Sequence, residues 1–185
     1  RGLDCICLDQ SQDAMLRKDL NNFMQDKDFY ARMGMPYRRG YLFSGKPGTG
    51  KSSLINAISA TFKRDLYYIN LKDFKDDTSL QCAFSDVKKN GIIVLEDVDA
   101  QSRIVHKRSE KKDSSKYKDT TSGGLSLSAL LNCMDGYTLN EGVMIIMTSN
   151  HPERLDPAVI RPGRIDLHLE LGYSTHYQIQ NMYSL

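Results

Sequence analysis

Residues 45–52 read Gly-Lys-Pro-Gly-Thr-Gly-Lys-Ser and match a phosphate-binding loop, in which glycine, lysine and a hydroxyl residue recur at fixed spacing. Backbone N–H groups in such a loop converge on anionic oxygens, and glycine permits the dihedral angles that this requires. Lys51 adds charge at the terminal phosphates, and Ser52 offers a hydroxyl ligand for Mg²⁺. The nucleotide-binding residues that we predict are Gly45, Lys46, Pro47, Gly48, Thr49, Gly50, Lys51, Ser52 and Ser53.

Polar residues also follow two later apolar runs. Glu96 and Asp97 come directly after the run at 92–95, and Asn150 follows the run at 143–148. Ligands of parallel α/β sheets bind at the carboxyl ends of the strands, so we expect these side chains to lie beside the loop. Asp99 is a third carboxylate in the same stretch, and we interpret it as a helix cap or a solvated group.

The elements that must hold these residues alternate between strand and helix patterns. Strands are predicted at 4–8, 40–44, 66–71, 92–95, 143–148 and 167–171. Helices are predicted after Ser11, after the loop, from Thr78, behind Ser126, after Asp156 and after Thr175. This alternation predicts an α/β fold with a parallel sheet covered by helices on both faces.

Composition limits the other function classes. The chain has 185 residues, 40% of them hydrophobic, and a formal net charge of +2, which suits one globular domain and argues against nucleic acid as a partner. The longest apolar run, at 143–147, is far below the ~20 residues of a membrane helix. Residues 101–124 are rich in lysine, serine and aspartate, and we expect a mobile surface insertion there.

The four cysteines are expected to be reduced thiols, because no C-x-x-C pair or zinc-like histidine spacing accompanies them. Cys5 and Cys7 would share one face of the predicted first strand. We interpret them, with Cys82 and Cys133, as small hydrophobic residues rather than redox groups.

Several of these segments together resemble the nucleotide-binding domain of AAA ATPases over nearly the whole chain. They are the loop at 45–52, the run at 92–99, Asn150 and residues 155–164, which read Leu-Asp-Pro-Ala-Val-Ile-Arg-Pro-Gly-Arg. A closer resemblance, to the Bcs-type subfamily, rests on residues 36–41, 95–100, 126–132 and 150–153. The resemblance implies a P-loop NTPase three-layer sandwich around a central parallel five-stranded sheet.

The family resemblance also implies roles for the acidic pair. It implies ATP hydrolysis with ATP and Mg²⁺ as cofactors, Ser52 and Glu96 serving the metal, Glu96 through water, and Asp97 polarising the attacking water. Most family members carry aspartate before glutamate, whereas this chain carries Glu96 before Asp97. The exchanged assignment of these two roles therefore stays open.

Two further site residues follow from the resemblance. Asn150 corresponds to a polar sensor that holds the attacking water, and Arg164 corresponds to an arginine finger that reaches the nucleotide of a neighbouring subunit. That role requires a homo-oligomeric ring. The family's usual second arginine is replaced by Leu167, so either Arg161 or Arg154 substitutes for it, or one finger suffices.

The resemblance divides the chain into an N-terminal part at 1–40, a nucleotide-binding core at 41–175 and, at 176–185, the start of a helical lid that is otherwise missing. It implies a chaperone or translocase that moves a folded protein substrate across a membrane, in the manner of the mitochondrial inner-membrane chaperone of respiratory complex III assembly. A membrane anchor would then lie outside this chain. The alternative is a nucleotide-gated assembly or binding module with slow hydrolysis, and a nucleic-acid motor is a weaker one.

Overall fold

The computed structural model describes residues 2–101 and 125–183 and contains one five-stranded sheet in the order β2-β3-β4-β1-β5. The strands are β1 (Arg38–Ser44), β2 (Leu66–Tyr68), β3 (Ile92–Leu95), β4 (Val143–Ser149) and β5 (Leu167–Glu170), and every pairing is parallel. The predicted α/β class with a parallel five-stranded sheet is therefore confirmed. The expected insertion at 101–124 lies, beyond Gln101, outside the described residues.

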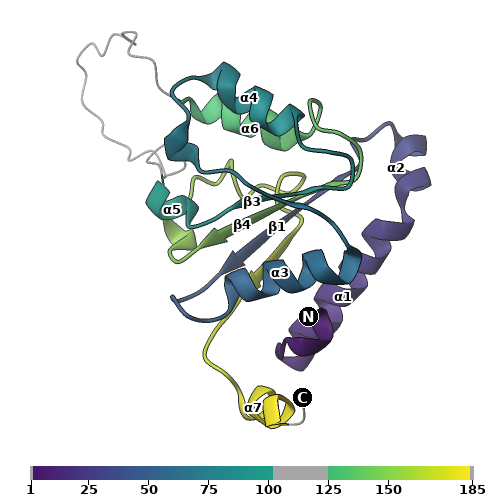
Figure 1. Ribbon diagram of the computed structural model, residues 1–185, viewed down its shortest axis with the longest axis vertical. Coiled ribbons are helices and arrows are strands. Elements are labelled where there is room, and N and C mark those ends of the chain that lie inside the picture. Colours follow the sequence, from purple (N-terminus) through teal and green to yellow (C-terminus); the bar gives the residue numbers. More distant parts are fainter. Residues whose placement is uncertain (1, 102–124, 184–185) are drawn as a thin grey trace.

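Helices cover both faces of the sheet and make three layers (Figure 1). On one face lie α1 (Gln10–Gln25) and α3 (Lys51–Phe62), and on the other lie α4 (Asp77–Ser85) and α6 (Leu127–Asp135). Successive strand side chains point to opposite faces. Ile92 and Val94 accordingly pack with α1 and α3, whereas Ile93 and Leu95 pack with α4 and α6. All four residues of β3 are fully buried, as its continuous apolar run predicts.

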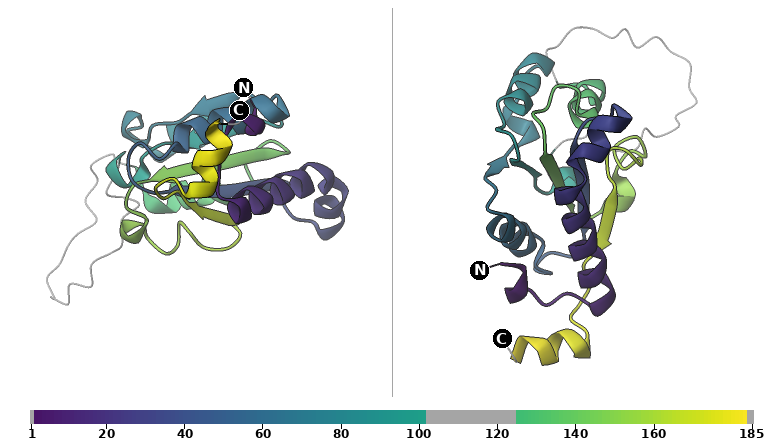
Figure 2. Two further views of the ribbon diagram at one scale, coloured as in Figure 1. Left: turned by 90° about the horizontal axis from the view of Figure 1, so that it is seen from below. Right: turned by 90° about the vertical axis from the view of Figure 1, so that its right-hand side faces the viewer.

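Shorter elements complete the described chain. They are α2 (Lys27–Met33), α5 (Val98–Gln101), α7 (His176–Tyr183) and the 3-10 turns η1 (Leu3–Cys5), η2 (Leu71–Asp73) and η4 (Pro152–Arg154). The sequence patterns did not predict α2, which ends at Gly34 in the left-handed conformation. In both views of Figure 2, α7 lies close to the N-terminal segment. Their contact is a hydrogen bond from Gln178 Nε2 to the Cys7 carbonyl oxygen, 3.0 Å long.

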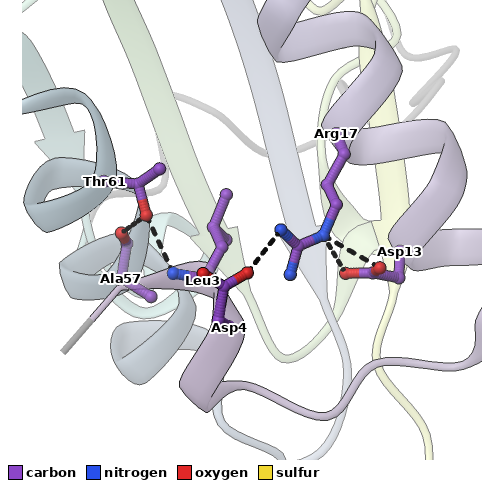
Figure 3. Close-up of polar contacts among 6 residues, drawn as sticks. All are labelled: Leu3, Asp4, Asp13, Arg17, Ala57 and Thr61. Atoms are coloured by element: carbon purple, nitrogen blue, oxygen red, sulfur yellow. Dashed lines mark hydrogen bonds and ion pairs between the residues drawn. The ribbon is translucent and has the colours of Figure 1, made fainter.

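The strand predicted at 4–8 is wrong, because η1 occupies its start and residues 6–9 have no regular secondary structure. Side chains of two helices hold this segment beside the sheet instead (Figure 3). The Leu3 N–H donates to Thr61 Oγ1 on α3 at 2.8 Å, and the Asp4 carboxylate pairs with Arg17 on α1 at 2.9 Å. The strand pairings of the sheet involve β1 through β5 and do not include residues 4–8.

The short helix predicted after Asp156 is also wrong, and the chain forms turns there. Asp156 does cap these turns. Its side chain accepts from the Ala158 N–H at 2.8 Å, and its backbone carbonyl accepts from the Val159 N–H at 2.9 Å. An α-helical hydrogen bond to the Ala158 carbonyl would have to come from residue 162, which is proline and has no N–H. That oxygen instead accepts from Arg164 Nη1 at 2.8 Å.

Two other boundaries shift by small amounts. The strand predicted at 66–71 ends at Tyr68, after which Leu71 begins η2. The helix predicted from Thr78 starts at Asp77, because the Asp76 side chain accepts from the Ser79 N–H at 2.7 Å and caps it.

Candidate active site

The phosphate loop joins the end of β1 to the start of α3, in the order predicted. Gly45 has φ of 140°, and a Cβ there would lie 2.1 Å from the Leu171 carbonyl oxygen, so no larger residue fits. Gly48 and Gly50 also have positive φ, of 82° and 93°, and Gly50 caps α3. The helix N-terminus, with its unpaired N–H groups and partial positive charge, therefore faces the loop.

Lys51 is the buried cation of this loop, with 8% of its surface exposed. Its Nζ donates to the Gly45 carbonyl at 2.7 Å, the Lys46 carbonyl at 3.0 Å and Asn150 Oδ1 at 2.8 Å. All three acceptors are neutral, and Lys51 forms no ion pair with another residue in the described ranges. Lys51 therefore carries a buried positive charge without a carboxylate in direct contact, and a bound anion can compensate it.

The two carboxylates that follow β3 contact different partners. Ser52 Oγ donates to Glu96 Oε1 at 2.7 Å, whereas Asn150 Nδ2 donates to Asp97 Oδ1 at 3.1 Å. Asp97 has the left-handed φ of 44°, and its N–H donates to Thr148 Oγ1 at 2.8 Å. Glu96 thus faces the loop hydroxyl, and Asp97 faces the residue that also contacts Lys51.

Asp99 is buried, with 7% exposure, so its interpretation as a solvated carboxylate is wrong. One of its oxygens accepts from Ser149 Oγ at 2.8 Å and from the Asn150 N–H at 3.0 Å. These bonds fix the backbone of Asn150 at the end of β4, which makes Asp99 a positioning residue for it. Its closeness to Asp97 in the sequence was the only available signal.

The donor set around Ser52 suits a hard divalent cation. Ser52 Oγ and the Glu96 carboxylate are oxygen ligands, which Mg²⁺ prefers. Mg²⁺ is usually held by one or two protein ligands together with substrate phosphates and water. Over the described residues no group of three or more His, Cys, Asp or Glu side chains is arranged to hold a metal.

The structure does not bring Arg164 to the phosphate loop of its own chain. Its side chain is 16% exposed, and Nε and Nη2 bind the Asp135 carboxylate at 2.7 and 3.0 Å. Arg161 and Arg154 are exposed, and neither forms an ion pair within the described part of the chain.

A cavity of about 600 Å³ lies beside the phosphate loop, and motif analysis missed most of its wall. The loop side is lined by Pro47, Gly48, Thr49, Gly50 and Ser53. The rest is lined by residues 5–9, Ser11 and Gln12 of α1, residues 170–175, and Gln178 and Met182 of α7. Lys46 Nζ contacts the Tyr173 hydroxyl at 3.1 Å at the edge of this region. The volume is typical of a small-molecule site. No sequence signal marked these residues, because they meet only through tertiary packing.

The loop, the acidic pair and the strand-end asparagine on a parallel sheet define a P-loop nucleotide-binding protein. The model of the ATPase family associated with various cellular activities (AAA) matches residues 41–173. This chain therefore belongs to the AAA family and is an AAA-family ATPase.

Relatives among curated proteins agree with the resemblance to the Bcs-type subfamily. The chain is 36% identical to the probable mitochondrial chaperone BCS1-B of Dictyostelium discoideum, over 99% of this chain and 44% of that protein. It is 36% identical to the mitochondrial chaperone BCS1 of Homo sapiens, over 99% of this chain and 43% of that protein. It is also 36% identical to an AAA-ATPase of Arabidopsis thaliana, over 93% of this chain and 34% of that protein. The chain thus spans less than half the length of these relatives.

Within the described ranges, no helix has both the length and the apolar character needed to cross a bilayer.

Proposed function

We propose that this chain is the motor domain of a ring-forming chaperone or translocase driven by ATP hydrolysis. The observation that carries the proposal is the Asn150 amide, whose Oδ1 accepts from Lys51 and whose Nδ2 donates to Asp97. One side chain thereby links the cation of the phosphate loop to a carboxylate beside it. This is the arrangement that phosphoryl transfer to water needs, because that reaction depends on positioning and charge neutralisation.

Each residue of the cluster has a distinct task in this proposal. The loop N–H groups and Lys51 bind the β- and γ-phosphates, and bound Mg²⁺ would neutralise charge on the phosphate oxygens. Ser52 and, through water, Glu96 would hold that ion. Asp97 Oδ1 takes the proton of the attacking water, and the Asn150 amide orients that water. The cavity walled by residues 5–9 and α7 receives the nucleoside.

The hydrolysis site is completed by the turn at 161–164 of a neighbouring subunit. Arg161 presents an exposed guanidinium, and Arg164 is available once it leaves Asp135. A cation supplied in trans is worth about 10³–10⁵ in rate in comparable enzymes. This proposal requires a homo-oligomeric ring, and membership of the AAA family suggests an oligomer.

The cargo is proposed to be a protein, and the compartment mitochondrial, because two of the relatives are named mitochondrial chaperones. By the subfamily resemblance, the cargo is a folded protein that crosses the inner membrane during respiratory complex III assembly, and a segment outside this chain anchors the ring. The segment between Leu71 and Thr78 fits folded cargo, since its only aromatic residue, Phe74, packs against the core.

A second candidate is a nucleotide-gated assembly module with slow hydrolysis. The order Glu96 then Asp97 favours it, because the side chain near Asn150 is one methylene shorter than the glutamate usual in the family. A small misplacement of a catalytic group lowers the rate strongly. ATP would then act mainly as a ligand that holds the ring together.

ATP turnover with Mg²⁺, measured beside ATP binding and ring assembly, separates the two candidates. We expect Asp97→Asn to bind ATP normally and to lose about 10²–10⁴ in kcat, the usual contribution of a general base. Glu96→Gln should raise the Mg²⁺ concentration needed for half-maximal turnover. Full turnover in Asp97→Asn with none in Glu96→Gln would exchange the two roles. A wild-type ring that binds ATP without hydrolysis would establish the second candidate.

A further inference from the structure

Two of the four cysteines lie in the wall of the cavity beside the phosphate loop. All four are free thiols, and Cys5 is exposed while Cys7 is half-buried. Both line the same cavity of about 600 Å³ as Pro47–Gly50. The expectation of small buried hydrophobic residues is therefore wrong for Cys5 and holds only in part for Cys7. Cys82 is exposed on α4, on the other face of the sheet, and Cys133 is buried in α6.

The segment that carries these thiols is fastened on both sides of them. Before them, Leu3 donates to Thr61 Oγ1, which itself donates to the Ala57 carbonyl at 2.8 Å, and Asp4 pairs with Arg17 (Figure 3). After them, Leu8 is buried with 6% exposure. The Cys7 carbonyl also accepts from Gln178 on α7. A group attached to either sulfur therefore stays at the cavity, because moving the segment away breaks these contacts.

We propose that Cys5 and Cys7 form a thiol-modification site whose reaction with a small disulfide, such as oxidised glutathione, excludes nucleotide from the cavity. This inference rests on the proposed function, because it takes nucleotide as the ligand that competes with the modification. Modification would then switch the ATPase off, and bound nucleotide would protect the thiols.

The reaction is a thiol–disulfide exchange. The cysteine thiolate attacks one sulfur of the disulfide R–S–S–R, a new S–S bond forms between protein and R–S, and R–S⁻ leaves and takes up a proton. The cysteine sulfur is oxidised, and the departing sulfur is reduced. Exchange requires an accessible thiolate, which Cys133 lacks, because burial raises the pKa of its thiol to about 11.

Bulk explains why the adduct and the nucleotide compete. A cavity of about 600 Å³ accommodates roughly one drug-sized ligand. A glutathionyl group is a tripeptide, so its attachment to the wall leaves no room for a nucleoside next to Pro47–Gly50. Cys82 offers the matched comparison, because it is exposed without lining this cavity.

The test uses the purified protein with oxidised glutathione, with and without Mg–ATP, and follows each cysteine by mass spectrometry. At about 100 times its Kd, nucleotide leaves the cavity free in about 1% of molecules, so modification of Cys5 and Cys7 should slow by about 100-fold. Modification of Cys82 should keep its rate. The glutathionylated protein should bind a fluorescent ATP analogue at least about tenfold more weakly, and dithiothreitol should restore binding.

Variants assign the effect to its residues. For the double variant Cys5→Ser/Cys7→Ser, nucleotide affinity should be the same before and after exposure to glutathione disulfide, whatever its value relative to wild type. The variant Cys82→Ser should lose affinity on exposure, as the wild type does. Equal modification rates with and without nucleotide, or unchanged affinity after modification, overturn the inference and leave the ATPase proposal intact. If the reduced protein binds no nucleotide at all, both proposals fail.

Discussion

Lys51 and Arg164 are two cations that sequence motifs assign to the site, and the fold treats them differently. Both are largely withdrawn from solvent. Arg164 has a carboxylate partner, Asp135, in a two-bond ion pair. Among the described residues, Lys51 donates to two backbone carbonyls and the Asn150 amide oxygen and forms no ion pair. The same kind of charge is therefore paired with a carboxylate at one position and surrounded by neutral acceptors at the other.

This difference shows which charge is available to a ligand. Burying a charge is costly unless an opposite charge or strong dipoles compensate it. At Arg164 the compensation comes from within the chain, so the charge contributes to folding. At Lys51 it comes from dipoles alone, and a bound anion would complete it. A motif gives the residue type, whereas its neighbours determine whether the charge serves stability or binding.

The largest expected effect is at Lys51. We expect Lys51→Met to weaken ATP binding by 2–5 kcal/mol, roughly 30-fold to several thousandfold, because the phosphates lose their buried cationic partner. The free energy of unfolding should change by less than about 1 kcal/mol, since no carboxylate is left unpaired. Isothermal titration with ATP and urea denaturation measure the two quantities. A large loss of stability with normal ATP affinity would reverse the comparison.

Arg164→Met should show the opposite pattern. Asp135 would keep its charge and lose both hydrogen bonds, and the Ala158 carbonyl would lose its donor. We expect the free energy of unfolding to fall by about 2–3 kcal/mol, measured by urea denaturation. ATP affinity of the single chain should stay within about twofold of wild type.

Arg161→Met is the matched control, because Arg161 is exposed and lies in the same turn. It should leave the free energy of unfolding within about 0.5 kcal/mol of wild type. Equal destabilisation by the two substitutions would mean that the Asp135 pair contributes nothing specific.

Elements with contiguous signals were predictable from the sequence. The apolar runs of β3 and β4 and the Ser126 cap of α6, which accepts from the Ala129 N–H at 3.1 Å, lie where the patterns indicate. Residues 4–8 and the turn after Asp156 were not, because distant side chains decide their structure. Thr61 and Arg17 hold the first, and in the second the Arg164 side chain donates to the Ala158 carbonyl.

In the candidate site, too, the residues of a local sequence pattern were predictable, and those that meet only in the fold were not. The phosphate loop is a local pattern, so its residues and its position between strand and helix could be predicted. The role of Asp99 required knowing that it meets the end of β4, fifty-one residues away at Asn150. The cavity wall required knowing that residues 5–9 and α7 meet at the loop. Neither pairing leaves a periodicity or a spacing in the sequence.

The smallest expected effect concerns His168, which holds the strand just before the loop. Its Nε2 lies 2.7 Å from Ser44 Oγ, across the pairing of β1 with β5. Burial lowers the pKa of His168, and the nearby Glu170 carboxylate opposes that change in part. The folded state therefore binds fewer protons than the unfolded chain at pH values just below the ordinary pKa of about 6.5.

The sign of the pH dependence follows from that difference. Stability from this histidine is fully present above about pH 6.5 and is lost as the pH falls below it toward the folded-state pKa. We expect the urea midpoint of the wild type to drop more between pH 8 and about pH 5.5 than that of His168→Gln. His176→Gln, at an exposed position on α7, should retain the wild-type drop. If His168→Gln also retains it, the contact between His168 and Ser44 at the β1 end of the loop does not couple protonation to folding.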